Sequence, residues 1–302
     1  MSNKEKIVLF LISAIKLKAY LFGYLFFILP LFSRVLFLKL MIRISHMLPS
    51  KIGNYVYLFN EYFSRIIFKF KKDEYFVIKK ILKNTKIRLD ITKKTQRMIF
   101  LKKEYESEIV SFLERELKGA KVFLDIGANI GYFTLIAKEI NPNIKVFSFE
   151  PEEKNLEYLE YNISLNNLGD VIVKEVALSN FSGEETLFIN PKNEGGHSLV
   201  ENKKYKEQKV VIEKLDNLMT NIKVDIAKID VEGFEFNVMK GGIKTLMENR
   251  DIKIVSELSR DFDEIKNITR ENNKNIYFLD SDGSQRKCLD GEILPFANYL
   301  IK

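Results

Sequence analysis

The chain has 302 residues, of which 46% are hydrophobic and 29% charged, with one cysteine, no tryptophan and a formal net charge of +7. This length accommodates a full α/β domain with additions. The single cysteine, Cys288, excludes a disulfide framework or a cysteine-rich zinc site within one chain. It agrees with a reducing, cytoplasmic compartment.

The charge is unevenly distributed along the chain. Residues 1–119 carry 24 Lys and Arg against 10 Asp and Glu, whereas residues 120–302 carry 24 against 31. The first part is therefore +14 and the second −7. This asymmetry predicts two parts with different surroundings.

Residues 1–45 combine basic character with apolar runs, since residues 19–33 contain no charge. A transmembrane helix needs about 20 apolar residues, and a longer span over residues 7–33 would bury Lys16 and Lys18. We therefore predict a peripheral or monotopic segment on the inner face of the membrane, with basic residues near anionic headgroups. The alternative is an apolar helix buried in a homodimer. A cleaved signal peptide is disfavoured, because no small-residue cleavage site follows residues 7–15.

Residues 46–83 are predicted to be a basic helical region. Aromatic residues and lysines alternate over residues 59–83 at spacings that suit an amphipathic helix. Such a pattern also occurs in nucleic-acid binders, but membrane proximity is the simpler interpretation, so no nucleic-acid partner is expected. Residues 87–91 alternate as in a strand or hairpin, and residues 104–117 have the periodicity of a helix.

From residue 121 onward, strand and helix patterns alternate. We predict strands at residues 121–125, 144–149, 171–177, 224–229 and 252–257, and helices at 130–140, 152–166 and 234–249. Short extended pieces at 184–189 and 209–213 enclose a loop, residues 190–205, that is expected to be a substrate-side insertion. Residues 275–280 and 285–289 predict an antiparallel C-terminal hairpin. The rhythm is that of a Rossmann-like parallel sheet with helices on both faces, whose ligands bind beyond the carboxyl ends of the strands.

A glycine-rich turn follows the strand at residues 121–125. Gly127 and Gly131 are four residues apart, which is not the spacing of the dinucleotide fingerprint. Asp125 would repel a pyrophosphate but favours a ligand that carries an ammonium and a sulfonium, as S-adenosylmethionine (SAM) does. Glu150 ends the next strand, where its carboxylate could accept from two ribose hydroxyls. The structural alternative is that Asp125 caps the turn and Glu150 is an exposed strand end.

Four short motifs, in this order and spacing, resemble the FkbM family of SAM-dependent methyltransferases over about residues 90–257. The matching positions are Asp125, Gly127, Ala128, Asn129 and Gly131 in the glycine motif, then Glu150 and Pro151, then Asn162 and Asn166, and finally Lys228, Ile229, Asp230, Val231, Glu232 and Gly233. The resemblance implies a class I methyltransferase domain over residues 84–302, with SAM bound by the glycine motif and the Glu150–Pro151 pair. It also implies O-methylation of sugars or secondary metabolites.

Asp230 and Glu232 follow the strand at residues 224–229 and are the first candidates for chemistry. Methyl transfer to oxygen requires an aligned acceptor and a group that takes the hydroxyl proton. Asp230 is the leading candidate for base or acceptor-orienting group, unless it is held structurally by Lys228. Glu232 is predicted to be catalytic, to cap the next helix, or to hold the SAM amino group. His197, in a glycine-rich polar loop, is the alternative base.

A divalent cation between Asp230 and Glu257 is a further hypothesis, since both carboxylates end neighbouring strands. Two carboxylates are few ligands, so no metal site is assigned. The sequence thus predicts an O-methyltransferase that acts on a sugar hydroxyl of a cell-surface glycan or glycolipid. Two alternatives stay open: a methyltransferase of a soluble secondary metabolite, and a non-catalytic SAM-binding membrane scaffold.

Overall fold

The computed structural model describes residues 74–190, 193, 195–258, 260–280, 282, 284–288 and 297–302. The chain divides into two compact units, residues 1–73 with 101–103, and residues 74–100 with 104–302. The predicted membrane-associated segment, residues 1–45, and residues 46–73 of the predicted basic helical region lie outside the described residues. No helix within the described ranges has the length and apolar character needed to cross a bilayer.

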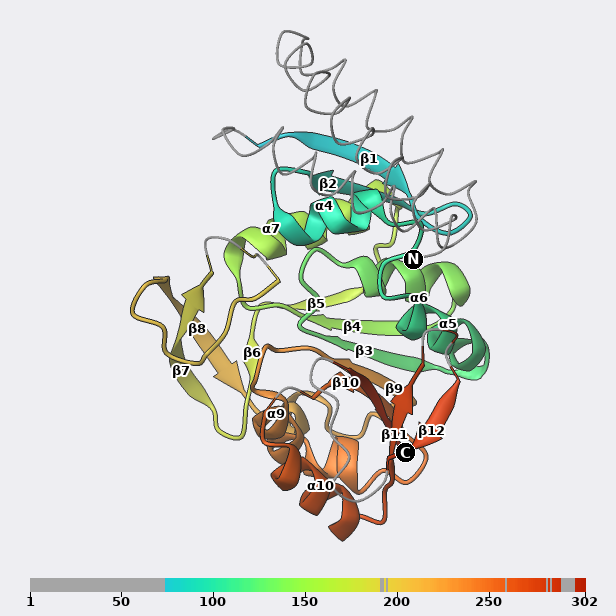
Figure 1. Ribbon diagram of the computed structural model, residues 1–302, viewed down its shortest axis with the longest axis vertical. Helices are drawn as coiled ribbons and strands as arrows, with labels where there is room; N and C mark the ends of the chain where they lie inside the picture. Colours follow the sequence, from blue (N-terminus) through green and yellow to red (C-terminus); the bar gives the residue numbers. More distant parts are fainter. Residues whose placement is uncertain are drawn as a thin grey trace, which may run out of the picture. The chain divides into compact units, whose positions relative to one another are not determined.

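An eight-stranded sheet forms the centre of the second unit (Figure 1). The strand order is β12-β11-β13-β10-β9-β3-β4-β5, with β3, β4, β5, β9 and β10 parallel and β13 antiparallel to both of its neighbours. The bounds are β3 Val122–Ile126, β4 Lys145–Phe149, β5 Ile172–Lys174, β9 Ile226–Ile229, β10 Lys253–Glu257, β11 Ile276–Leu279, β12 Gln285–Lys287 and β13 Asn298–Ile301. The central strands are mostly apolar because both sheet faces are covered. The predicted α/β class is confirmed.

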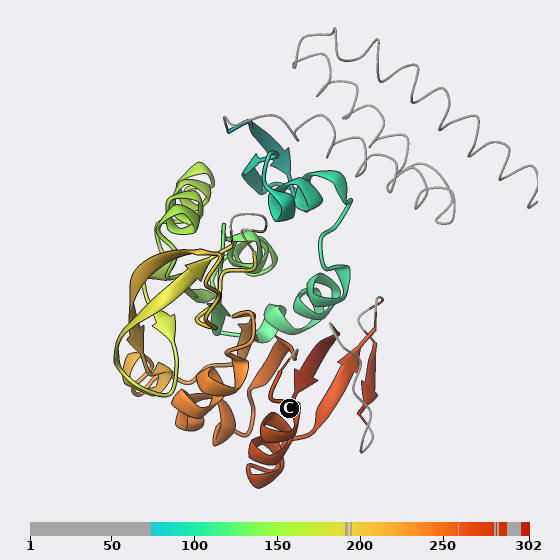
Figure 2. The same cartoon turned by 60° about the vertical axis from the view of Figure 1, so that its left-hand side comes forward.

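Helices cover both faces of this sheet (Figures 1 and 2). From β3 the chain progresses toward one edge of the sheet, and α6 (Tyr132–Ile140) and α7 (Glu153–Leu165) connect β3, β4 and β5. From β9 it progresses toward the opposite edge, and α9 (Glu235–Gly241) and α10 (Phe262–Glu271) connect β9, β10 and β11. Right-handed crossovers that progress in opposite directions place their helices on opposite faces. The predicted antiparallel hairpin is β11–β12.

The first described elements form a hairpin of β1 (Phe76–Lys80) and β2 (Lys86–Asp90), followed by α4 (Lys94–Leu101), α5 (Ser107–Glu116) and a 3₁₀ turn (Leu117–Gly119). The helix predicted over residues 59–83 is wrong for residues 76–80. Burial there has a period of two, with Val77 buried and Ile78 exposed, and Val77 pairs with Leu89 of β2. The second unit therefore includes ten residues before the predicted boundary at residue 84.

Two other predicted elements differ in detail. The strand predicted at residues 171–177 is divided, because β6 (Ala177–Leu178) leaves the main sheet and pairs with β8 (Lys206–Glu213), which also pairs with β7 (Gly183–Ile189). The helix predicted at 234–249 breaks after Gly241, where a Cβ would lie 1.9 Å from the Ser179 carbonyl oxygen. A π-helix (Ile243–Met247) follows. A short helix, α8 (Leu215–Leu218), and strand β13 were not predicted.

Helix α6 holds the turn of the β1–β2 hairpin through one side chain, Glu139. Its carboxylate accepts hydrogen bonds from the backbone N–H groups of Lys83, Asn84 and Thr85, each at 2.8 Å. Burial alone would raise the pKa of Glu139, but these donors outweigh it and the pKa is lowered. The hairpin is thereby attached to the catalytic domain.

We expect Glu139→Ala to lower the free energy of unfolding by about 1–2 kcal/mol, because three backbone donors lose their acceptor. Urea denaturation at pH 7 measures this, with the exposed Glu160→Ala on α7 as the control, expected to change stability by less than about 0.5 kcal/mol. Since the folded pKa is lowered, the native advantage is present above the ordinary value of 4.5 and is lost as the pH falls through the folded value. Stability curves that stay equally far apart into acid would contradict this role.

Candidate functional site

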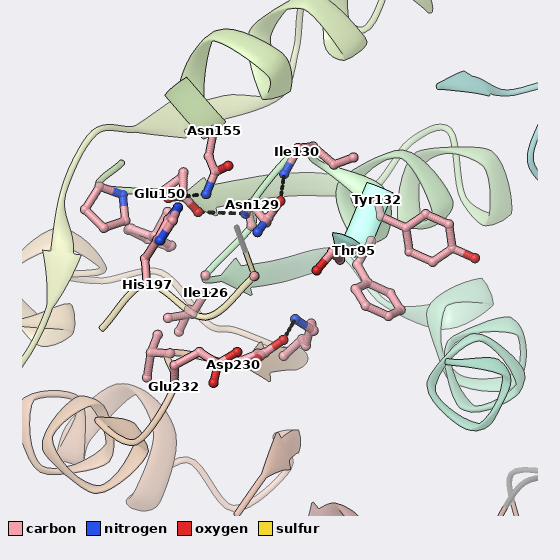
Figure 3. Close-up of a pocket in the computed structure, with 18 of the residues that line it drawn as sticks. Thr95, Ile126, Asn129, Ile130, Tyr132, Glu150, Asn155, His197, Asp230 and Glu232 are labelled. Atoms are coloured by element: carbon pink, nitrogen blue, oxygen red, sulfur yellow. Dashed lines mark hydrogen bonds and ion pairs between the residues drawn. The ribbon is translucent and has the colours of Figure 1, made fainter. Parts of the chain in front are cut away.

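A pocket of about 280 Å³ opens at the carboxyl ends of β3, β4 and β9 (Figure 3). Strands β3 and β9 are neighbours from which the chain progresses in opposite directions, so this edge is the topological switch point of the sheet. The loops after these strands, helix α4, the start of α5 and the segment around residues 193–199 line the pocket. The structure therefore places the motifs from distant parts of the sequence in one cavity.

The cofactor loop, defined here as residues 127–131, lies on one wall. Gly127, Asn129 and Gly131 have φ values of 77°, 50° and 86°, in the left-handed region that favours glycine and tolerates asparagine. A Cβ on Gly127 would lie 1.9 Å from the carbonyl oxygen of Asp230. Glycine is therefore required here both by conformation and by the close approach of the β9 end. Of the predicted loop residues, Gly127, Ala128 and Asn129 line the pocket, and Gly131 caps α6 behind it.

Glu150 lies against this loop at the end of β4. Its carboxylate accepts from the backbone N–H of Asn129 at 2.7 Å and from that of Glu152 at 3.0 Å. The side chain is 5% exposed, and burial raises its pKa to about 7. An ionised carboxylate has about four acceptor positions, so it retains capacity for a ligand hydroxyl. Pro151 lines the pocket beside it.

Asp125 lies beneath the pocket and is not among the lining residues. It is fully buried, and its Oδ2 accepts from the Thr134 hydroxyl at 2.6 Å while its Oδ1 has no hydrogen-bond partner. Burial raises its pKa, and Lys228 on the adjacent strand opposes that effect. The predicted contribution of Asp125 to SAM binding thus stays a prediction, and the geometry favours an effect through its charge.

Asp230 and Glu232 face Glu150 and Asn129 across the pocket (Figure 3). Asp230 Oδ2 accepts from the Lys228 ammonium at 2.9 Å. Lys228 is 4% exposed; burial would lower its pKa, but Asp230, Asp125 and Glu106 outweigh this and raise it. The ammonium therefore stays charged and fixes the Asp230 carboxylate, which suits a group that orients an acceptor.

Glu232 lies at the exposed rim of the pocket with a φ of 52°, directly before Gly233. Desolvation of its carboxyl and repulsion by Asp230, Glu257 and Glu235 raise its pKa to about 8. Such a group titrates near physiological pH and can accept a proton once ionised. The predicted helix-capping role of Glu232 is not supported, because Phe234 is the N-cap residue of α9 and no side chain caps it. Glu235, the first residue of the helix, instead accepts at Oε1 from the backbone N–H groups of Val231 and Gly233 in the preceding loop.

His197 lines the pocket from the loop before β8. Its Nδ1 accepts from the backbone N–H of Asn190 at 2.9 Å. Burial, assisted by Lys93, lowers its pKa to about 4. A neutral imidazole that accepts at Nδ1 carries its proton at Nε2, so this geometry presents a hydrogen-bond donor and disfavours the predicted role as base.

The sequence analysis missed the contribution of residues 94–106 to the site. Helix α4 contributes Thr95, Met98 and Ile99 to the lining, and the start of α5 contributes Glu106. Glu106 has a φ of 48°, and burial raises its pKa to about 7. An acidic residue ahead of a predicted helix was the available signal, but such residues usually serve as caps.

The residues present fit SAM, because a glycine-containing loop faces a buried carboxylate at a strand end and further carboxylates lie opposite. Gly127 and Asn129 would contact the cofactor through backbone, and Glu150 would bind its ribose hydroxyls. No group of three or more metal-ligating side chains is close enough to hold a metal ion in the part of the chain that the structure describes. The hypothesis of a cation between Asp230 and Glu257 therefore receives no support.

Comparison with known proteins gives a consistent picture. Residues 125–282 match the methyltransferase FkbM domain family. The chain is 29% identical to methyltransferase sdnD of Sordaria araneosa, over 39% of this chain and 59% of that protein. It is 25% identical to Methyltransferase 1 of Beauveria bassiana, over 39% of this chain and 57% of that protein. The match thus spans less than two thirds of the length of either relative.

Similar solved structures include methyltransferases at low sequence identity. TYW2 of M. jannaschii in complex with AdoMet has a TM-score of 0.38 and 15% identity, covering 76% of this chain and 85% of that chain. A SAM-dependent O-methyltransferase of Thermotoga maritima has a TM-score of 0.36 and 13% identity, covering 64% and 63%.

We expect Gly127→Ala to weaken SAM binding at least tenfold, because the added methyl group would lie 1.9 Å from a backbone oxygen at a φ of 77°. Gly119→Ala is the matched control, since a Cβ there meets nothing within 4 Å. Calorimetric titration of SAM measures both. Unchanged affinity in a folded Gly127→Ala variant would show that the cofactor does not depend on this approach.

Proposed function

Since the chain belongs to the FkbM methyltransferase family, we propose that it is a SAM-dependent methyltransferase that methylates a hydroxyl oxygen of a sugar in a cell-surface glycan or glycolipid. The observation that carries the proposal is the acidic wall of the pocket, defined as Glu106, Asp230, Glu232 and Glu257. Carboxylates bind the paired hydroxyls of sugars by accepting two hydrogen bonds. They also repel phosphate and carboxylate groups, which favours a neutral acceptor.

The bound SAM supplies an electrophilic methyl group. With the cofactor bound, Asp230, fixed by Lys228, would orient the acceptor hydroxyl and Glu232 would take its proton. The carbon–oxygen bond would form as the methyl–sulfur bond breaks, which leaves S-adenosylhomocysteine. The reaction needs little more than alignment and one proton acceptor.

The apolar, basic residues 1–45 support an acceptor held at the inner face of the membrane. The second candidate is a soluble, partly apolar metabolite, which the apolar side chains of Met98, Ile99 and Leu199 in the lining favour. In that case residues 1–45 would serve a homodimer. Both candidates retain the same chemistry at oxygen.

We expect labelled methyl groups from SAM to appear on neutral glycolipids of a membrane extract as ethers. Ethers survive mild alkali, whereas methyl esters of acidic sugars are hydrolysed. Thin-layer separation before and after alkali measures the difference, and an extract with acetylated hydroxyls is the control. Label that is released by alkali, or that is transferred only to soluble metabolites, would contradict the glycan proposal.

We expect the transfer rate to rise with pH through about 8, because Glu232 must be ionised to accept a proton and its pKa is about 8. Glu232→Gln should lower the rate about 100-fold or more and remove this limb, with little change in SAM affinity. If His197 were the base, the limb would lie near its pKa of about 4. A Glu232→Gln variant with the native profile would exclude Glu232.

A further inference from the structure

Asn162 joins the cofactor loop to the β1–β2 hairpin. It lies on α7 with no exposed surface. Its Nδ2 donates to the Ile130 carbonyl of the cofactor loop at 2.9 Å, and its Oδ1 accepts from the backbone N–H of Arg88 at 2.7 Å. Its Nδ2 also lies 3.4 Å from the Arg88 carbonyl oxygen. One buried amide therefore contacts both the cofactor site and a hairpin that precedes the matched family domain.

Asn166 holds the same strand one helical turn further on. It accepts from the Lys86 N–H at 2.8 Å and donates to the Lys86 carbonyl at 2.6 Å and to the Asn162 carbonyl at 2.8 Å. Four helical residues rise about 6.0 Å and two strand residues about 6.7 Å. The Asn-x-x-x-Asn pattern therefore matches every second residue on the free edge of β2. The two side chains stand in for a neighbouring strand.

The cofactor loop needs such support. Asn129 has a φ of 50°, a conformation that a residue other than glycine keeps only where surrounding contacts fix it. The Glu150 carboxylate fixes the loop at Asn129, and Asn162 fixes it at the next carbonyl, Ile130. Of the two asparagines, Asn162 contacts the loop, whereas the hydrogen bonds of Asn166 run to β2 and to its own helix.

We propose that Asn162 is a positioning residue that couples SAM binding to docking of the β1–β2 hairpin. Bound SAM would fix the cofactor loop, and the loop would fix the Asn162 amide through the Ile130 carbonyl. The Asn162 amide would then fix the edge of β2 at Arg88. Because such coupling is reciprocal, a docked hairpin strengthens SAM binding by the same factor by which SAM strengthens docking.

The test compares Asn162→Ala with Asn166→Ala in the full chain, since both variants lose hydrogen bonds to β2 but only the first loses the bond to Ile130. Calorimetric titration should show SAM affinity about tenfold weaker in Asn162→Ala and within twofold of native in Asn166→Ala. Thermal unfolding without SAM reports the purely structural cost of each. Equal SAM affinities in native protein and a folded Asn162→Ala variant, or equal losses in both variants, would overturn the proposal.

A second measurement uses the native protein alone and decides the matter even if Asn162→Ala fails to fold. Hydrogen exchange of peptides covering residues 86–90 should slow at least tenfold at saturating SAM, beyond any slowing in peptides covering residues 276–279. Slowing that is no greater in the hairpin than in β11 would overturn the coupling. Neither measurement involves a methyl acceptor, so failure of the glycan proposal would leave this result unaffected.

Discussion

The close approach of two backbone segments, at Gly127 and Asp230, is the constraint on which the site depends. With glycine at this position, the turn after β3 lies against the end of β9, which a Cβ would prevent by coming within 1.9 Å of a carbonyl oxygen. This contact occurs where the chain reverses its progress across the sheet. It places the cofactor loop and the acidic wall on opposite sides of one pocket, so that side chains from residues 94–257 can contact the same small molecule.

Buried charge is the second determinant of the site. Lys228 lies between the carboxylates of Asp230 and Asp125. Lys228 and Asp230 line the pocket, and Asp125 lies beneath it. An isolated buried ammonium would be costly, and its neighbours compensate for the lost hydration. The remaining carboxylates of the acidic wall form no ion pair in the part of the chain that the structure describes, and burial raises the pKa of Glu106 and Glu232 into the neutral range. Within the acidic wall, Asp230 thus forms a stabilising ion pair, whereas Glu106 and Glu232 are the groups that can exchange a proton near neutral pH.

The sequence was sufficient to predict the parallel strands and the site residues that follow them, but not strand β13 or the contribution of residues 94–106 to the pocket. Strands β3, β4 and β9 were predicted because each is mostly apolar and is followed by an acid or a glycine, a pattern that both sheet position and chemistry impose. Strand β13 was not predicted because no turn signal marks its four residues. Its place between β10 and β11 depends on tertiary contacts. The start of β1 was mistaken for helix because aromatic and basic residues alternate there without a clear period.

Two side chains show why local patterns do not determine roles at the site. Asp125 matches a cofactor motif, yet side chains alternate along a strand, and this one lies with Thr134 and Ser148 beneath the pocket. Glu106 matches no motif, yet the fold brings it to the acidic wall from a segment outside the matched domain. The sequence alone does not show in which direction a side chain points or which distant segments the fold brings together.

The most direct test of the account is a crystal structure of the protein with S-adenosylhomocysteine. The account predicts that the ribose hydroxyls lie about 3 Å from the Glu150 carboxylate, that backbone of residues 127–129 contacts the ligand, and that the sulfur faces Asp230. A ligand that binds elsewhere, or one that leaves Glu150 out of hydrogen-bond reach, would contradict the assignment of this strand edge as the methyl-transfer site.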